Sequence, residues 1–177
     1  RIDLEDLAVV AGAQIRGAGA VIHGGPHERG AGLVEAGDGR PERQAAVVGR
    51  KIYDAIIERL TYDKEIPGCG IGDTTWVMKY NRGKCDDYHA LFMAMMVARG
   101  VPVRWEQGFP LPYPTKEAET AGGLSGDCTG AHCWASFYDR DLGWIPVDVS
   151  EADKRPDLRD FFCGHLTPNR FKVSEGR

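Results

Sequence analysis

One apolar run constrains the fold of this chain more than any other feature of its sequence. Residues 90–98 are alanine, leucine, phenylalanine, methionine and valine only, and neither glycine nor proline follows before Gly100. Such a run predicts a largely buried helix of about four turns. Cys85 stands where this helix would begin, directly after a bend at Gly83. The sequence therefore places a cysteine at the N-terminus of a core helix.

The N-terminus of a helix changes the acid–base chemistry of a thiol. Unpaired backbone N–H groups and the positive end of the helix dipole favour an anion there. A cysteine so placed can have a pKa well below the free value of about 8.5, which makes it a nucleophile near neutral pH. We therefore interpret Cys85 as a candidate nucleophile, against the alternative that its side chain only packs. Asp86 and Asp87 would complement the helix dipole.

Two strand-like segments follow later in the chain, and a turn separates them. Residues 131–138 and 144–149 are rich in aromatic and β-branched side chains, whereas residues 139–143 include two aspartates and a glycine. We expect an antiparallel hairpin with its turn centred on Arg140. One face of this hairpin would be apolar and would pack on the core.

The expected register brings a histidine and a carboxylate together. With the turn centred on Arg140, His132 faces Asp148 and Trp134 faces Pro146. Pro146 has no N–H to donate, so it fits a cross-strand pair without hydrogen bonds. His132 and Asp148 would form a pair of the same kind. Side chains opposed in this way lie roughly 4.5–5.5 Å apart at Cβ. Asp148 would then hold the imidazole of His132.

Four segments of the chain, in this order, resemble the transglutaminase-like superfamily, and more narrowly its bacterial members with a papain-type core. They are residues 83–89, 100–104, 132–135 and 143–148. The resemblance extends over residues 45 to 175 and implies an α+β fold, in which the helix that carries the nucleophile packs on an antiparallel β-sheet. It also implies roles for three residues, the nucleophile Cys85, the base His132 and the orienting carboxylate Asp148.

The chemistry that these residues predict is acyl transfer through a thioester. His132 would take the proton of Cys85, and Asp148 would fix the tautomer of His132 and stabilise its charged form. Hydrolysis of a peptide or other amide bond is the favoured reaction, with a peptide or protein as the substrate. Transamidation of protein glutamine on the same triad is the alternative, because nothing in these residues chooses between water and an amine as the acceptor.

Three tryptophans and a second histidine are further candidates. The resemblance implies a polar aromatic or amide side chain that stabilises an oxyanion, so the indole N–H of Trp76 could join the backbone N–H of Cys85 in that role. Trp134 and Trp144 could line or floor the substrate cleft, and core packing is the alternative for all three tryptophans. His89 lies four residues after Cys85 on the same helical face, where it would compete as a base or hydrogen-bond within the core.

Two other classes of function remain open. Zinc could bind to Cys128, His132, Cys133 and either Cys163 or His165, which supply suitable ligand atoms in close succession. Adjacent residues of a strand point to opposite faces, which argues against a shared metal and leads us to expect neither a metal nor another cofactor. A domain of the same fold that binds without catalysing is the other alternative.

Composition bounds the organisation of the chain. We expect residues 1–40 to be an irregular segment rich in glycine and alanine, and residues 41–177 to be the catalytic domain. Residues 42–60 show the spacing of an amphipathic helix. Residues 108–130, with their prolines and glycines, predict a long loop that either walls the cleft or lies apart on the surface.

Charge and hydropathy exclude several partners. The net charge is −4 without a dense basic cluster, so we expect no nucleic-acid partner. No apolar run is long enough to cross a membrane, and no signal peptide is evident, so we expect no membrane insertion. The chain begins with arginine, which leaves room for an upstream targeting piece; it is either cytoplasmic or secreted after processing.

Overall fold

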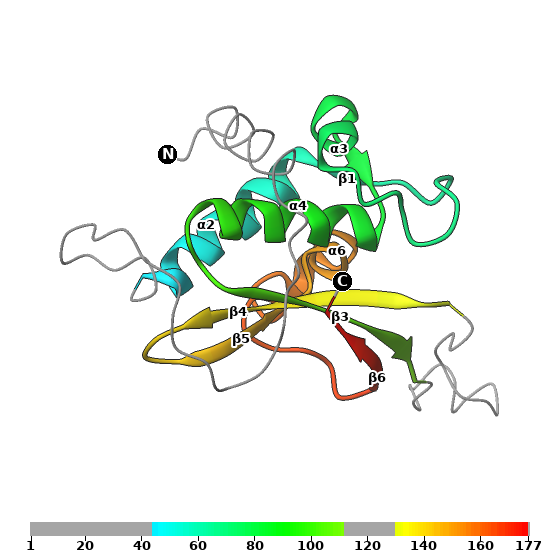
Figure 1. Ribbon diagram of the computed structural model, residues 1–177. Helices are drawn as coiled ribbons and strands as arrows, with labels where there is room; N and C mark the ends of the chain where they lie inside the picture. The colour runs from blue at the N-terminus through cyan, green and yellow to red at the C-terminus, as the bar shows by residue number, and fades with distance from the viewer. Residues whose placement is uncertain (1–43, 112–129, 177) are drawn as a thin grey trace.

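The described chain forms two layers, a group of helices and an antiparallel sheet beneath them (Figure 1). The computed structural model describes residues 44–111 and 130–176. The sheet has four strands in the order β5-β4-β3-β6, and the short strands β1 and β2 pair in parallel apart from it. The expected α+β fold with a helix on an antiparallel sheet is confirmed. The elements are α2 (Ala45–Arg59), β1 (Thr61–Tyr62), α3 (Thr74–Tyr80), β2 (Arg82–Gly83), α4 (Cys85–Ala98), β3 (Val103–Pro110), β4 (His132–Asp139), β5 (Gly143–Val147), α6 (Val149–Lys154), the 3-10 helix η2 (Pro156–Leu158) and β6 (Arg170–Glu175).

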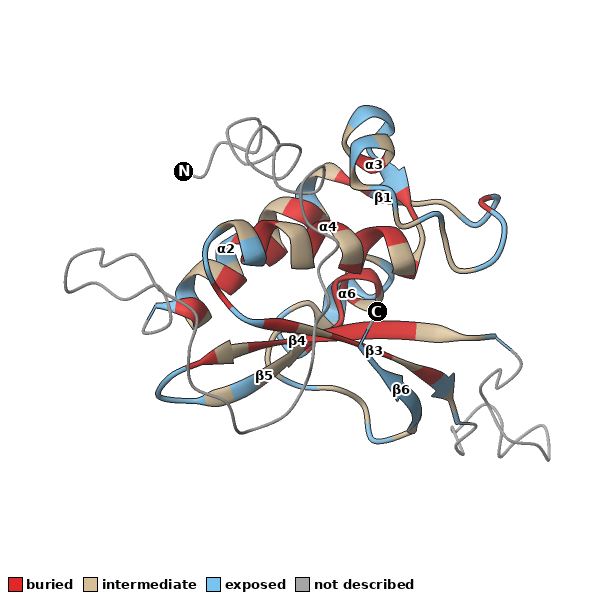
Figure 2. Ribbon diagram, viewed as in Figure 1, coloured by how far each residue is buried: buried red, intermediate tan, exposed pale blue. Residues whose placement is uncertain are grey.

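Helix α4 is the centre of the core, as its sequence predicts. It contacts α2, α3 and α6 as well as strands β3 and β4, and its inward face is buried along its whole length (Figure 2). The ring of Phe92 lies 5.9 Å from that of Phe137 on β4, measured between centroids. Burial of each large apolar side chain contributes about 1.5–3 kcal/mol. The α4 residues with at most 2% exposure include Tyr88, Leu91, Phe92, Met95 and Met96.

The end of α4 follows from the glycine after it. Gly100 has a φ of 73°, in the left-handed region that favours glycine. Its N–H donates to the carbonyl of Val97 at 2.9 Å, and the N–H of Val101 donates to the carbonyl of Met96 at 3.0 Å. This pair of bonds is the Schellman motif, which satisfies the last carbonyl groups of a helix. Val101, at 2% exposure, then leads the chain into the sheet.

The hairpin of β4 and β5 forms, but the expected register is wrong by two residues. Pro146 pairs with Ser136, not with Trp134. Strand β5 ends at Val147, so Asp148 does not stand opposite His132 within the sheet. A shift of two residues leaves every side chain on the same face of the sheet. Asp148 therefore still lies on the side of the hairpin that His132 occupies.

A side chain explains the shifted position of the turn. The Oδ1 atom of Asp139 accepts hydrogen bonds from the N–H groups of Asp141, at 3.0 Å, and Leu142, at 3.2 Å. Gly143, with a φ of 78°, closes the loop and pairs with Asp139. The turn is thus centred on Asp141 and not on Arg140. The aspartate that opens the turn sets its length by binding the main chain.

Three helices either were not predicted from the sequence or differ from their predicted bounds or buried face. Helix α3 was not predicted; its N-cap is Asp73, whose carboxylate accepts from the N–H of Thr75 at 2.9 Å. Helix α6 follows β5 directly, where a continuing strand was expected. Helix α2 lies within the expected residues 42–60, although Val47 is 57% exposed and not on the buried face.

Strand β6 closes the sheet beside β3, and a glycine allows the close approach. A Cβ atom on Gly108 would lie 1.9 Å from the carbonyl oxygen of Phe171. Gly108 also pairs with His132 across the other edge of β3. The absence of a side chain there lets β6 bring Arg170, its first residue, to the same end of the sheet as His132.

Some expectations cannot be compared with this structure. Residues 1–40, Cys128 and most of the loop at residues 108–130 lie outside the described residues. The division at residue 41 therefore stays a prediction. Among the helices of residues 44–111 and 130–176, none combines the length and apolar composition that crossing a bilayer requires.

Candidate active site

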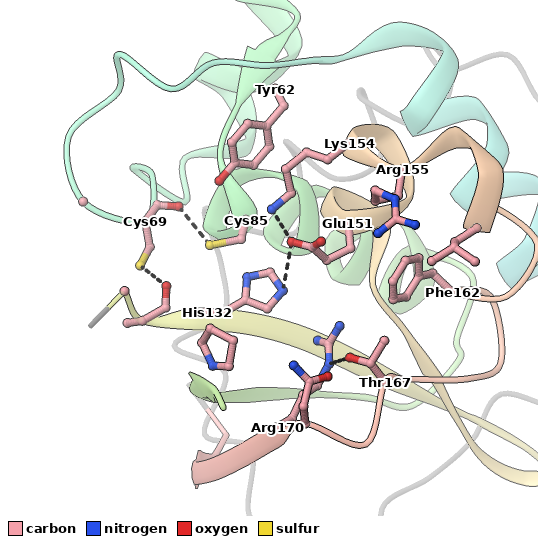
Figure 3. A pocket seen from close by; sticks show the side chains of 16 residues that line it. Tyr62, Cys69, Cys85, His132, Glu151, Lys154, Arg155, Phe162, Thr167 and Arg170 are labelled. Atoms are coloured by element: carbon pink, nitrogen blue, oxygen red, sulfur yellow. Dashed lines mark hydrogen bonds and ion pairs between the residues drawn. The ribbon is translucent and has the colours of Figure 1, made fainter. Parts of the chain in front are cut away.

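A pocket of about 500 Å³ opens where the N-termini of α4 and α6 meet the start of β4 (Figure 3). Cys85 and His132 both line it, together with Tyr62 and Cys69 on one side and Arg170 on the other. The structure thus brings the candidate nucleophile and base to one cavity. Asp148 lies directly behind His132 and is fully buried.

Buried Asp87 fixes the first turn of α4 and the loop beside it. Its Oδ2 accepts from the N–H of Lys84 at 2.8 Å. Its Oδ1 accepts from the N–H groups of Ile71, at 2.9 Å, and Gly72, at 2.8 Å. The expected role of complementing the helix dipole is therefore joined by a larger one. The carboxylate of Asp87 holds the loop at Ile71 and Gly72 against the turn that carries Cys85.

Cys85 is the first residue of α4, and its side chain faces the pocket. In its thiol form, Sγ lies 3.6 Å from the carbonyl oxygen of Cys69 and can donate to it. A hydrogen bond from the Cys133 thiol and, against the cost of burial, one from His132 lower the pKa of Cys85 to about 3. At neutral pH the sulfur is a thiolate, the form that attacks carbonyl groups.

His132, the first residue of β4, connects the sulfur to a carboxylate. Its Nε2 lies 2.7 Å from Oδ2 of Asp148, and the ring also hydrogen-bonds Cys85. Since Nε2 is taken by Asp148, Nδ1 is the atom left for the sulfur. Burial opposes the charged ring, but the negative charge and hydrogen bond of Asp148 and the bond to Cys85 raise the pKa of His132 to about 9. The pair is therefore a thiolate beside an imidazolium.

Asp148 caps helix α6 as well as binding the histidine. Its Oδ1 accepts from the N–H of Glu151 at 2.9 Å and from the hydroxyl of Ser150 at 3.1 Å. Its Oδ2 accepts from Nη1 of Arg170 at 2.6 Å in addition to His132. Burial would raise the pKa of this carboxyl, but His132 and Arg170 hold it well below its usual range. The carboxylate is thus held in place from four directions.

Arg170 is a site residue that the hairpin pattern did not reveal. Its side chain is 9% exposed, and its guanidinium lies 5.1 Å from the ring centroid of Trp134. Nε donates to the hydroxyl of Thr167 at 3.2 Å, which fixes the plane of the group. The only sequence signal was the position of Arg170 in the C-terminal part of the family resemblance. No spacing within the chain connects it with Asp148.

The two remaining cysteines near Cys85 occupy different surroundings. Cys69 lines the pocket, and burial together with the neighbouring Cys85 raises the pKa of its thiol to about 11. Its Sγ donates to the carbonyl of Ala131 at 3.3 Å. Cys133 is fully buried, and burial above all raises its pKa. Its Sγ lies 3.5 Å from a carboxylate oxygen of Asp86.

The structure places the three candidate tryptophans outside the lining of this pocket. Trp76 packs against Tyr80 on α3, with 5.0 Å between ring centroids. Trp134 is buried behind His132, and its Nε1 donates to Glu106 at 2.5 Å. Trp144 lies at the surface on β5 and is 41% exposed. The oxyanion and cleft roles of the three tryptophans therefore stay predictions.

The zinc alternative finds no arranged ligand set in the part of the chain that the structure describes. There, no group of three histidine, cysteine or acidic side chains is placed to hold a metal ion. His132 is turned to the pocket and to Asp148, whereas Cys133 is turned to the core. Cys128, the first ligand of that alternative, lies outside the described residues.

Two curated relatives match part of the chain. An uncharacterized protein of Haemophilus influenzae is 32% identical over 117 residues, which cover 58% of this chain and 31% of that protein. The uncharacterized protein YebA of Bacillus subtilis is 25% identical over 79 residues, which cover 42% of this chain and 10% of YebA. The match thus spans less than a third of either relative.

Solved structures with similar folds share little sequence with this chain. The periplasmic domain of TgpA from Pseudomonas aeruginosa has a TM-score of 0.46 at 21% identity, over 72% of this chain and 47% of that one. EGTA-treated LapG from Legionella pneumophila has a TM-score of 0.49 at 16% identity, over 75% of this chain and 63% of that one. These values are too low to bear on activity.

The match to a family model is more extensive. The model of the transglutaminase-like superfamily core matches residues 36–149, which include Cys85, His132 and Asp148. This segment runs from before α2 to the first residue of α6. Because the match covers more than half of its length, the chain belongs to the transglutaminase-like superfamily.

Proposed function

We propose that this protein transfers acyl groups through a thioester on Cys85, and that its reaction is the hydrolysis of a peptide or other amide bond. Membership of the transglutaminase-like superfamily supports a cysteine-dependent hydrolase or acyltransferase in general. The observation that carries the proposal is the linked set at the pocket, in which Cys85 hydrogen-bonds His132, and His132 hydrogen-bonds buried Asp148.

The first step is attack by the thiolate. The sulfur of Cys85 forms a bond to the carbonyl carbon of the substrate, and the electron pair of the C=O double bond moves to oxygen. Cys85 is the first residue of α4, so its N–H has no partner within the helix and can donate to that oxyanion. One such donor contributes about 10²–10³ in rate.

The second step expels the amine and the third releases the acid. His132 gives its Nδ1 proton to the nitrogen of the leaving amine, the C–N bond breaks, and a thioester on Cys85 remains. Water then attacks the thioester while His132 takes one proton from it, and the C–S bond breaks. General acid–base catalysis of this kind contributes about 10²–10⁴ in rate. Asp148 holds the ring so that Nδ1 faces the sulfur throughout.

The charge state of the pair predicts the pH dependence of the reaction. The pKa of Cys85 is about 3 and that of His132 is about 9, so the thiolate and the imidazolium coexist between these values. Below the lower value the nucleophile is protonated, and above the upper value the general acid has lost its proton. We expect kcat/KM to follow a bell-shaped profile with its plateau between these limits.

Intact-mass trapping tests the proposal directly. The protein is incubated with a panel of peptide amides, with and without a primary amine, and the masses of enzyme and products are recorded. We expect a thioester adduct on Cys85 and a free carboxylic acid as the product. An amide formed with the added amine would instead assign transamidation, the alternative within this superfamily.

Two variants make the test specific. Cys85→Ala removes the nucleophile, whereas Cys163→Ala removes a half-buried cysteine that does not line the pocket. We expect the first to abolish adduct and turnover and the second to keep both. Turnover that persists in Cys85→Ala would end the proposal, as would a wild-type protein whose Cys85 forms no adduct and resists iodoacetamide at neutral pH.

A further inference from the structure

His89 is a buried histidine that the proposed reaction does not use directly. It lies one helical turn after Cys85 and has no solvent exposure. Its Nδ1 is 2.7 Å from the carbonyl oxygen of Cys85, and its Nε2 is 3.1 Å from the backbone nitrogen of Val149. The ring thus spans the gap between the first turn of α4 and the first residue of α6.

The partners of the ring determine its tautomer. A backbone N–H can only donate, so Nε2 of His89 must be the unprotonated acceptor for Val149. Nδ1 then carries the hydrogen and donates to the carbonyl of Cys85. His89 is therefore neutral, and burial, which lowers its pKa, agrees with this state. Oδ1 of Asp148, 3.7 Å from Nε2, already accepts from two other groups.

The two bonds join the main chains of the proposed nucleophile and of the carboxylate. One bond ends on the carbonyl of Cys85, and the other ends on the peptide unit between Asp148 and Val149. His132 lies between the side chains of the same two residues, bonded to both. Any change in the separation of these two main-chain positions changes the fit of the imidazole between the sulfur and the carboxylate.

We propose that His89 is a positioning residue, which sets the distance between the main chains at Cys85 and Asp148 and thereby the geometry of the thiolate, imidazole and carboxylate. The inference rests on the proposed function. The ring does not serve as the base, because Nδ1 carries its hydrogen and donates to a carbonyl, while Nε2 accepts from a backbone N–H.

Packing around the ring prevents it from turning. The ring of Trp105 meets it edge to face at 6.3 Å between centroids, with 89° between the planes. The sulfur of Cys133 lies 3.7 Å from Nδ1. The titratable groups that face His89 are Cys85 on its own helix, Cys133 on β4, His132, and Asp148 before α6. The geometry of both hydrogen bonds is therefore held by contacts on several sides.

Three substitutions separate the two bonds. His89→Leu fills the site but removes both. The side-chain nitrogen of His89→Asn reaches the position of Nδ1 and keeps a donor for Cys85, whereas the oxygen of His89→Gln reaches the position of Nε2 and keeps an acceptor for Val149. Met96→Ala is the matched control, because it weakens the same helix at a fully buried residue outside the site.

The first measurement is the rate at which iodoacetamide alkylates Cys85 as a function of pH, which requires no substrate. A misplacement of about 1 Å costs about 100-fold in catalysis, and a weaker thiolate–imidazolium pair raises the pKa of the thiol. We expect the midpoint of the alkylation rate against pH, which reports the pKa of Cys85, to rise by about one pH unit or more in His89→Leu. The second measurement is turnover, where we expect kcat to fall about 10-fold to 100-fold with KM almost unchanged.

The outcomes distinguish this inference from the proposed function. Values for His89→Asn and His89→Gln that lie between those of wild type and His89→Leu would support it. A midpoint and a kcat in all three variants equal to those of Met96→Ala would overturn it, while leaving the proposed function intact. A wild-type Cys85 that reacts no faster at pH 6 than a free thiol would overturn the proposed function itself.

Discussion

Replacement of Asp148 by asparagine tests how the buried charge acts on the reaction. The pKa of His132 stands at about 9 against an ordinary 6.5, although burial alone would lower it. At about 1.36 kcal/mol for each unit of pKa, the surroundings favour the imidazolium by about 3 kcal/mol. The charge of Asp148 is the largest contribution in that direction. Asp148→Asn keeps a side-chain oxygen for the N–H of Glu151 but removes this charge.

We expect two changes in the profile of kcat/KM against pH. The basic limb, which reports the loss of the imidazolium proton, moves from about 9 toward or below 6.5, because the charged ring has lost its stabilising partner. The maximal rate falls by about 10²–10⁴, since the asparagine amide no longer favours the tautomer that turns Nδ1 to the sulfur. A profile recorded from about pH 5 to pH 10 covers both effects.

The control is a second buried aspartate that lies away from the pocket. Asp139 is 3% exposed and accepts from backbone N–H groups in the turn and at the start of α2. Asp139→Asn makes the same chemical change there and should leave the profile in place. If the basic limb of Asp148→Asn coincides with that of the wild type, Asp148 does not set the pKa of His132, and the reasoning above is refuted.

Three further substitutions have defined outcomes. Arg170→Gln removes one of the two cationic side chains that bind the buried carboxylate of Asp148, and we expect a loss of about 3–5 kcal/mol in the free energy of unfolding, measured by urea denaturation. Cys69→Ser should keep kcat/KM within about threefold, because the side chain of Cys69 donates to the carbonyl of Ala131 and a serine hydroxyl can donate there too; a loss beyond 100-fold would assign the thiol a role in the reaction. Gly83→Ala places a Cβ atom 2.4 Å from that of Asp87. It should lower the melting temperature and slow alkylation of the nucleophile, and an unchanged melting temperature would contradict the close packing there.

The nucleophile helix could be predicted because several local signals agree on it. The apolar run from residue 90 to residue 98 is long enough to favour a buried helix over a strand. Gly100 supplies the residue in the left-handed region that ends this helix. Its beginning at Cys85 follows from Gly83, which must lack a side chain to admit Asp87. Each of these signals lies within a few residues of the structure that it specifies.

The hairpin shows why the face was predicted correctly and the register was not. Side chains alternate along a strand, so the polar residues His132 and Asp148 had to share a face under any even shift of register. The shift itself depends on which N–H groups the carboxylate of Asp139 binds, and the composition of the turn does not reveal that choice. Gly143 is compatible with both registers, since each needs a flexible residue near the second strand.

Arg170 and Trp76 show the limit of sequence reasoning for long-range contacts. Arg170 reaches Asp148 only because β6 pairs with the far edge of β3, a pairing between segments 60 residues apart or more in sequence. Trp76 is close to Cys85 in sequence, but the capped helix α3 turns its indole toward Tyr80. Distance along the sequence therefore does not reveal which neighbour an indole packs against.

The polar groups beneath the pocket divide by function. Asp87, His89 and Asp148 have no solvent exposure, so each would destabilise the fold if its hydrogen bonds were missing. Asp87 and His89 bind main-chain groups both at the start of α4 and in another segment, which fixes where α4 begins relative to the loop at Ile71 and Gly72 and to α6. Only Asp148 binds a titrating side chain and tunes its charge. Glu151 and Lys154 line the open rim and pair with each other, but a carboxylate oxygen of Glu151 also lies 3.9 Å from Nε2 of His132, so a change of this rim residue would act on the charge of the proposed base.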